Sequence, residues 1–404
     1  MFFFAYVDRV NISFAAMDMR RDLQISASIY GLGAGIFFLG YFLFEIPGNY
    51  LLTRIGARLW LSVCMIAWGV ISASMSCVTN GTELLCGRFV LGVAEAGFYP
   101  GILFFLMQAF PRHWHGRVIS YLIVVIPVSS ALSAFMSGLI FHLHGVLGLH
   151  GWQWLFVLEG LPSILLGFVL YGYLPNRIEE ASWLTQAERE YLALRHQESG
   201  LRSSSKSFRV FASVAADGTV WRLAAIFFCI SFVNGTIHFW LPQIVSSVGY
   251  GRQTVMRLVT VPYILGALAL IVCAARSDRT GNPRTALFVA MIASCMGLFM
   301  TAWGGNVMWQ GLFMTIAIAC LFIVLGLLWV IPGDRLRGTK VAGGVALINS
   351  VGNLGNFFGP TIFSFTLEKS GHYQIGLLMD AIIVFLAAVM FMAVTAVATQ
   401  RGDV

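Results

Sequence analysis

The chain has 404 residues, of which 58% are hydrophobic and only 11% are charged, and its mean hydropathy is +0.81. Soluble proteins carry roughly 25% charged residues. This chain therefore has too few charges to cover a surface in water, and we predict a membrane protein. The net charge of +7 is typical of membrane proteins with basic cytoplasmic loops, so we expect no nucleic-acid partner. The seven cysteines show no metal-ligand spacing, and we expect neither a metal nor a cofactor.

Apolar runs long enough to cross ~30 Å of hydrocarbon recur along the whole chain. We expect twelve membrane-spanning helices, at about residues 1–19, 28–52, 59–78, 82–109, 117–141, 152–174, 218–246, 253–275, 284–303, 306–331, 341–367 and 373–399. One long polar stretch, residues 175–217, separates the sixth from the seventh. Within it, Thr185 and Glu188 have the spacing of a capping box and predict a short amphipathic helix. We therefore expect an N-terminal six-helix bundle (1–174), a cytoplasmic central loop (175–217) and a C-terminal six-helix bundle (218–404).

The distribution of Lys and Arg predicts the topology. Of the 25 such residues, five lie in loops on one side (Arg20, Arg21, Arg252, Arg257 and Lys369), three lie within apolar segments (Arg9, Arg88 and Arg222), and the other 17 lie on the side of the central loop. Cytoplasmic loops are enriched in Lys and Arg. We therefore expect a multi-pass protein of the inner (plasma) membrane with both termini in the cytoplasm.

The two halves share a short motif. TRIGARLW (53–60) follows the second segment, and SDRTGNPR (277–284) follows the eighth. The six-plus-six organisation and this D-R-x-G element resemble the major facilitator superfamily. The resemblance implies an all-α fold of two pseudo-symmetric six-helix bundles, transport by alternating access rather than enzymatic catalysis, and an inner gate that includes Asp278, Arg279 and Gly281. In the first half, Thr53 stands where that superfamily usually has Asp.

Four longer motifs narrow the resemblance. YVDRVNISFA (6–15), GRFVLGVAEAGFYPG (87–101), GWQWLFVLEGLP (151–162) and GGVALINSVGNLGNFFGP (343–360) are similar to the anion:cation symporter family. The resemblance implies proton-coupled import of a small organic anion such as tartrate or a sugar acid, or alternatively an aromatic carboxylate of the phthalate or hydroxyphenylacetate type. Relatives have more residues before the Tyr-x-Asp-Arg motif, so we expect a first helix shortened at its N-terminus.

Asp8, Arg9, Arg88 and Glu95 lie inside apolar segments, where a charge costs from roughly 2.5 to above 10 kcal/mol unless it faces a polar cavity or a partner. Asp8 and Glu95 fall on the positions of the family's proton-binding carboxylates, and Arg88, two helical turns before Glu95, is expected to tune it. Arg9 is expected to bind the substrate carboxylate, because its planar guanidinium can donate two parallel hydrogen bonds. The alternative is a static ion pair in which Arg9 only neutralises Asp8.

The resemblance adds Tyr6, Tyr41, Trp329 and Asn349 as residues lining the substrate cavity, with ordinary helix or lipid packing as the alternative for each. Glu45 is expected to belong to an inner gate, or else to be an interfacial charge.

Three further features have expected structural roles. His238 is expected to lie at the membrane interface, and Glu159 is expected to be structural. Asn349, Asn353 and Asn356 form a stripe interleaved with Gly352, Gly355 and Gly359, where glycines allow close helix approach.

Other functions are weighed against import. A drug–proton antiporter is disfavoured because the fifth segment, IPVSSALSAFMSG, lacks a glycine- and proline-rich pattern. A non-transporting membrane sensor is disfavoured because it would need an added signalling domain. Direct use of ATP is disfavoured because the sequence lacks a Walker-A loop. Sodium coupling stays open beside proton coupling. The expected partners are a small organic carboxylate, protons and the lipid bilayer, and we expect a monomer.

Overall fold

The computed structural model describes residues 1–110, 114–175, 181, 184–186, 188, 190, 216–281, 283–303, 305–329, 331 and 340–400. Within these residues the long elements are all α-helices: α1 (Phe2–Asp22), α2 (Ala27–Ile55), α3 (Ala57–Ser74), α4 (Gly81–Glu95), α5 (Phe98–Ala109), α6 (His115–Ile140), α7 (Gly151–Tyr173), α10 (Gly218–Ser246), α11 (Arg252–Thr280), α12 (Pro283–Trp303), α13 (Val307–Leu327), α15 (Lys340–Asn353), α16 (Gly355–Ser370) and α17 (Tyr373–Gln400).

Helices among the described residues cover all twelve predicted spans. Ten segments are long and apolar enough to span a membrane by length and composition. The other two predicted spans correspond to α1, which carries several charges, and to the consecutive pair α15 and α16. The predicted all-α membrane fold is confirmed.

Local sequence signals set the helix ends. Side chains at four N-caps accept a hydrogen bond from the first turn, which satisfies a backbone N–H that has no partner within the helix: Ser26, Asn80, Asp217 and Asn306. The glycines of the repeated motif end the corresponding helices. Gly56 follows α2 with φ 86°, and Gly281 follows α11 with φ 64°, backbone angles that glycine adopts without strain.

Two of the predicted continuous helices are broken. Residues 82–109 form α4 and α5, because Gly97 takes φ 83° directly after Glu95 and Ala96. Residues 341–367 form α15 and α16. Leu354 lies between them, where its N–H bonds to Val351 O at 3.2 Å and the helix tightens. The first break ends α4 at a buried carboxylate, Glu95.

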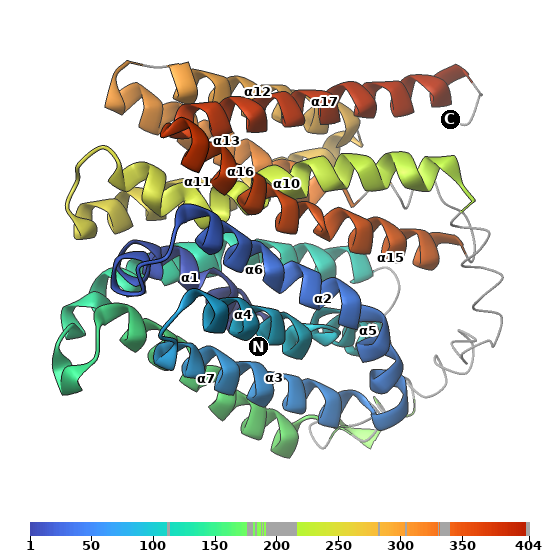
Figure 1. Ribbon diagram of the computed structural model, residues 1–404. Helices are drawn as coiled ribbons and strands as arrows, with labels where there is room; N and C mark the ends of the chain where they lie inside the picture. Colours follow the sequence, from blue (N-terminus) through green and yellow to red (C-terminus); the bar gives the residue numbers. More distant parts are fainter. Residues whose placement is uncertain are drawn as a thin grey trace.

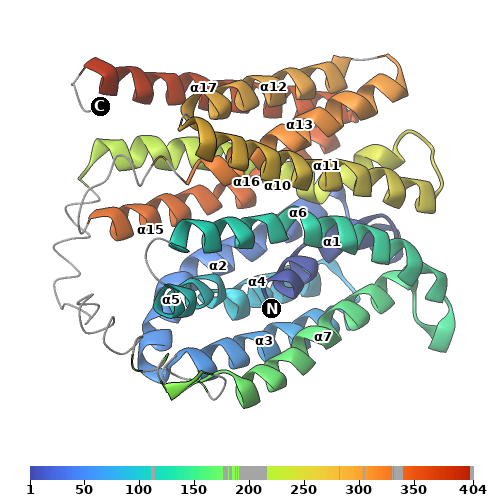
Figure 2. The same cartoon turned by 180° about the vertical axis from the view of Figure 1, so that it is seen from behind.

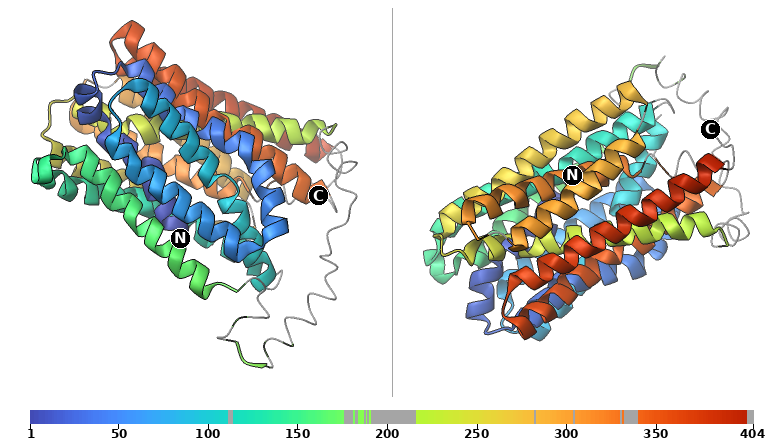
Figure 3. Two further views of the ribbon diagram at one scale, coloured as in Figure 1. Left: turned by 60° about the horizontal axis from the view of Figure 1, so that its bottom comes forward. Right: turned by 90° about the horizontal axis from the view of Figure 1, so that it is seen from above.

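The helices form two bundles that pack side by side (Figures 1 and 2). α3 packs on α7 and α2 on α4 in one bundle, and α12 packs on α13 and α17 in the other. The bundles meet along α2 with α16 and along α6 with α11, while α1 contacts α10. We call the end of the molecule where α1 finishes the Asp22 end, and the opposite end, where α7 finishes and α10 begins, the Gly218 end (Figure 3).

Glycines allow the closest helix contacts. A Cβ on Gly355 would lie 2.2 Å from Phe228 O, and one on Gly359 would lie 2.1 Å from Phe232 O. Both distances are far below van der Waals contact, so only glycine lets α16 approach α10 this closely. This approach holds the predicted asparagine stripe against the centre of the molecule.

Candidate functional site

A central cavity of ≈ 100 Å³ lies between the two bundles. Its walls come from both: Phe2, Tyr6, Arg9, Phe38, Tyr41, Tyr99, Ile123 and Ile126 on one side, and Phe227, Ser231, Asn234, Leu325, Trp329, Asn349, Asn353 and Asn356 on the other. The structure thus brings together all five residues that the sequence predicted to contact substrate. Asn353 and Asn356 also reach this cavity, although the sequence singled out only Asn349 from the stripe.

Arg9 supplies the positive charge of the cavity. Its Nη2 donates to Glu95 Oε1 in an ion pair between α1 and the end of α4. Its guanidinium also lies over the rings of Tyr6 at 4.8 Å and Tyr41 at 5.5 Å, where aromatic faces stabilise a cation. The Nε of Arg9 makes no hydrogen bond to the described residues.

Arg88 is fully buried but does not pair with Glu95. Its Nε donates to Gly33 O at 3.3 Å, and its Nη2 contacts Arg9 O at 3.5 Å. The sequence suggested that Arg88 acts on Glu95 because the two share a face of α4. Glu95 forms its ion pair with Arg9 of α1, and the tuning of Glu95 by Arg88 stays a prediction.

Asp8 points away from Arg9. Adjacent residues on a helix are separated by about 100°, so Asp8 faces α3 and α7 within the first bundle. Ser72 Oγ donates to Asp8 Oδ1 at 2.8 Å, and Ser163 Oγ and Trp68 Nε1 donate to Oδ2 at 2.6 and 3.2 Å. Arg9 therefore does not act as the counter-ion of Asp8. The three donors were missed from the sequence because serine and tryptophan are common in membrane helices.

Glu45 bridges the bundles on the Gly218 side of the cavity. Its carboxylate accepts from Asn349 Nδ2 at 3.2 Å and from Ser350 Oγ at 2.9 Å, and it is only 6% exposed. It is therefore buried between α2 and α15 rather than interfacial. Of the other predicted gate residues, Arg279 is exposed and Gly281 ends α11. The side chain of Asp278 lies outside the described residues.

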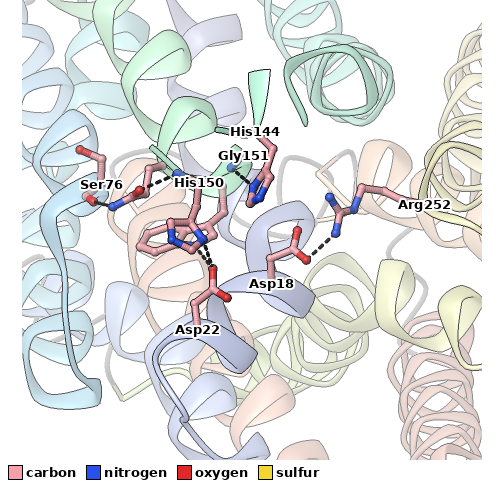
Figure 4. Close-up of polar contacts among 9 residues, drawn as sticks. Asp18, Asp22, Ser76, His144, His150, Gly151 and Arg252 are labelled. Atoms are coloured by element: carbon pink, nitrogen blue, oxygen red, sulfur yellow. Dashed lines mark hydrogen bonds and ion pairs between the residues drawn. The ribbon is translucent and has the colours of Figure 1, made fainter. Parts of the chain in front are cut away.

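Contacts between the bundles join them at the Asp22 end. Asp18 of α1 forms an ion pair with Arg252 of α11 (Figure 4). Deeper in, Tyr30 Oη donates to Phe239 O at 2.8 Å, and its ring packs edge-on against Trp240 with centroids 5.1 Å apart. These contacts separate the central cavity from the Asp22 end.

His238 is not an interfacial residue, contrary to the sequence-based expectation. It is 5% exposed, and Ser130 Oγ of the other bundle lies 3.0 Å from its Nε2. Its ring packs against Tyr263 at a centroid distance of 5.4 Å. His238 therefore joins α10 to α6 across the interface between the bundles.

Two further carboxyl groups are buried. Glu159 accepts from Ser133 Oγ at 3.0 Å within the first bundle. Asp380 of α17 is 0% exposed, and the sequence analysis did not single it out. Among the residues described, no group of His, Cys, Asp and Glu could hold a metal ion.

The comparisons agree with this architecture. Residues 1–360 match the Major Facilitator Superfamily profile. A protein named "Putative tartrate transporter" from Agrobacterium vitis is 36% identical over 408 residues, covering 100% of this chain and 93% of that protein. A quinolone resistance transporter from Acinetobacter baumannii is 32% identical over 392 residues, covering 96% of this chain and 90% of its own.

Solved structures support the same fold. An inward-facing, unoccupied bacterial homologue of the human lysosomal transporter Spinster superposes with a TM-score of 0.79 at 15% identity, covering 98% of this chain and 95% of that one. A D-xylose–proton symporter superposes with a TM-score of 0.77, also at 15% identity, covering 96% of this chain and 94% of that one. The chain therefore belongs to the Major Facilitator Superfamily and is a multi-pass membrane transporter, not an enzyme.

Proposed function

We propose that the chain imports a small organic anion of the tartrate or sugar-acid class together with protons. The observation that carries the proposal is Arg9, a buried guanidinium that faces the central cavity, pairs with Glu95 and keeps its Nε free of partners among the described residues. Arginine matches the planar geometry of a carboxylate. The hydroxyl of Tyr6 and the amides of Asn349 and Asn353 supply hydrogen bonds for the hydroxyl groups of such a substrate.

Proton coupling follows from competition for Arg9. Glu95 and a substrate carboxylate are both acceptors for the same guanidinium. A proton that binds to a Glu95 carboxylate oxygen removes its charge, which weakens its hold on Arg9 and leaves the guanidinium for the substrate. When the substrate leaves towards the cytoplasm, Glu95 releases the proton and pairs with Arg9 again. One proton thus accompanies each substrate carboxylate through this pair.

Asp8 is the second proton-coupling residue in this proposal. Three side-chain donors within the first bundle bond to its carboxylate. Asp8 can therefore change protonation without contacting the substrate. We take residues 1–174 and 218–404 as the two bodies that rock against each other, with the Asp22 end outside. The bridge from Glu45 to Asn349 and Ser350 then belongs to the inner gate, together with Asp278, Arg279 and Gly281. In this scheme the protein works as a monomer in the inner membrane, with both termini in the cytoplasm.

The second candidate substrate is an aromatic carboxylate. The cavity wall contains several aromatic rings besides Tyr6 and Tyr41, including Tyr99 and Trp329, and these rings could stack on an aromatic substrate. The two transporters compared above are named for tartrate and for quinolone resistance. Their names therefore do not distinguish a tartrate-like substrate from an aromatic carboxylate.

Uptake by the purified protein in proteoliposomes tests the proposal. A panel of labelled acids, including tartrate, a sugar acid and phthalate, is offered with an acidic exterior, and the wild type is compared with Arg9→Gln. Accumulation of one class that requires the pH gradient and is lost in Arg9→Gln supports the proposal. If none of these acids accumulates, or if a sodium gradient drives uptake without a pH gradient, the proposed function is wrong.

A further inference from the structure

A second cavity, of ≈ 370 Å³, lies at the Asp22 end, where the last turns of α1 meet the end of α10 and the start of α17. We propose that it is an outer anion-binding site, which captures the carboxylate of the substrate before the central cavity opens to the outside. The inference rests on the proposed function for the orientation of this end and for the chemistry of the ligand.

The cavity is positively charged. Arg20 and Arg21 line it together with Gln243, Ser246 and Tyr373, and the remaining lining is apolar. No carboxylate is among the lining residues in the described part of the chain. Two guanidinium groups beside two hydroxyls and an amide form a donor-rich site, which fits an anion such as a carboxylate.

The two acids of the last turns of α1, Asp18 and Asp22, have other partners. Asp18 pairs with Arg252, and Asp22 accepts from Trp152 Nε1 at 2.8 Å and lies 2.7 Å from His150 Nδ1 (Figure 4). Both carboxylates are therefore paired with residues outside the cavity lining.

The site also has unused hydrogen-bond donors. Arg20 Nη1 donates to Gln243 Oε1 at 2.8 Å, which links α1 to α10 across the two bundles. Gln243 is only 3% exposed. Neither its Nε2 nor the Nε of Arg20 makes a hydrogen bond within the described residues, although both atoms are buried. Buried donors are nearly always paired, so an acceptor that reached these atoms would complete their hydrogen bonding.

An anion in this cavity would act on the closed Asp22 end. A carboxylate is a stronger acceptor for a guanidinium than an amide oxygen is, so it competes with Gln243 for Arg20 and weakens that link between the bundles. Tyr30 and Trp240 lie between this cavity and the central one. Capture at Arg20 and Arg21 therefore precedes transfer to Arg9, and it favours the opening that the transfer requires.

Cysteine labelling in intact cells tests the site without relying on transport. Ser246→Cys places a thiol in the cavity, and Ser247→Cys places one on the neighbouring exposed residue, which does not line it. We expect a negatively charged methanethiosulfonate reagent to label Ser246→Cys faster than a positively charged one, relative to Ser247→Cys and above the labelling of the unsubstituted chain. Arg21→Gln should lower the preference for the negatively charged reagent roughly tenfold, whereas the control Arg257→Gln, on the same side of the membrane, should leave it unchanged. Tartrate outside the cells should slow the labelling of Ser246→Cys.

Transport kinetics test the capture role. Arg20→Gln with Arg21→Gln should raise the external KM for uptake roughly five- to tenfold and leave the KM for efflux from the inside unchanged, while Arg257→Gln should change neither. Equal labelling by both reagents without protection by tartrate or phthalate would overturn the site. Unchanged external KM would overturn its role in capture. If the labelling preference and the protection hold but no acid is transported, the outer site stands and the proposed function fails.

Discussion

Glu95→Gln is the sharpest test of the pairing between Arg9 and Glu95. Glutamine has nearly the shape of a protonated glutamate and cannot carry the negative charge. It therefore fixes the cavity in the state in which Arg9 is available to the substrate. We expect the variant to bind tartrate tightly at all pH values and to lose accumulation driven by a pH gradient, while keeping exchange of substrate across the membrane.

The size of the effect follows from the ion pair. Two unit charges about 4 Å apart interact by about 4 kcal/mol at an effective dielectric constant of 20, and the substrate must displace this interaction in the wild type at alkaline pH. The amide oxygen of glutamine retains part of the hydrogen bond to Arg9. We therefore expect a gain in affinity of at least tenfold at alkaline pH, which corresponds to about 1.4 kcal/mol, and little gain at acidic pH, where wild-type Glu95 is itself protonated.

Binding of labelled tartrate to detergent-purified protein over a range of pH measures this difference. Glu159→Gln is the matched control, because Glu159 is also buried in the first bundle but bonds to Ser133 rather than to Arg9. The control should keep the pH dependence of the wild type. If Glu95→Gln binds with the same pH dependence as the wild type, or still accumulates substrate against a gradient, Glu95 is not the carrier of the coupled proton.

The other predictions concern Asp8, Arg9, Glu45 and the membrane potential, and uptake is measured in proteoliposomes. Asp8→Asn should abolish gradient-driven uptake and lower the free energy of unfolding by about 1–3 kcal/mol, because the amide N–H₂ of asparagine would face the hydrogen-bond donors that now bond to the carboxylate. An unchanged melting temperature and unchanged uptake would contradict this. Arg9→Lys keeps the charge but loses the planar geometry, so tartrate affinity should fall at least tenfold; an unchanged affinity would leave Arg9 as a counter-ion only. Glu45→Ala should lose the hydrogen bonds to Asn349 and Ser350. Cysteines introduced between the cavity and the Gly218 end should then be labelled several-fold faster by reagents from that end, and an unchanged labelling rate would show that Glu45 is not part of the gate. With a monovalent anion, two coupled protons make uptake respond to an inside-negative potential by about 2.3 kcal/mol per 100 mV, whereas indifference to a valinomycin-imposed potassium potential would leave one proton.

The membrane fold was predictable because it rests on strong local signals. Apolar runs of membrane-spanning length and the polar stretch at 175–217 are visible without any tertiary information. The helix breaks after Glu95 and at Leu354 were not predicted. Each depends on a backbone change of one or two residues inside an apolar run, and hydropathy does not respond to that.

The sequence predicted which residues lie at the candidate site, but not which of them form ion pairs and hydrogen bonds with each other. Charges are rare enough in apolar segments that Asp8, Arg9, Arg88 and Glu95 stand out at once. Which acid pairs with Arg9 depends on how α1 lies against α4, and the two partners are 86 positions apart in the chain. No local pattern encodes that contact. Asp380 went unnoticed because a single carboxyl near the start of the last apolar run resembles an interfacial residue until its burial is seen.

The adjacency of Asp8 and Arg9 gives α1 two separate sets of contacts. Through Asp8 it is tied to Ser72 and Ser163, and hence to α3 and α7 of the first bundle. Through Arg9 it presents a charge to the cavity that both bundles share. A rotation or shift of α1 that follows substrate binding at Arg9 must therefore strain or relieve the hydrogen bonds at Asp8, since the two residues are joined by one peptide bond. Protonation of Asp8 would weaken the same hydrogen bonds from the other side, so α1 can couple the two sites without a direct contact between the carboxylate and the substrate.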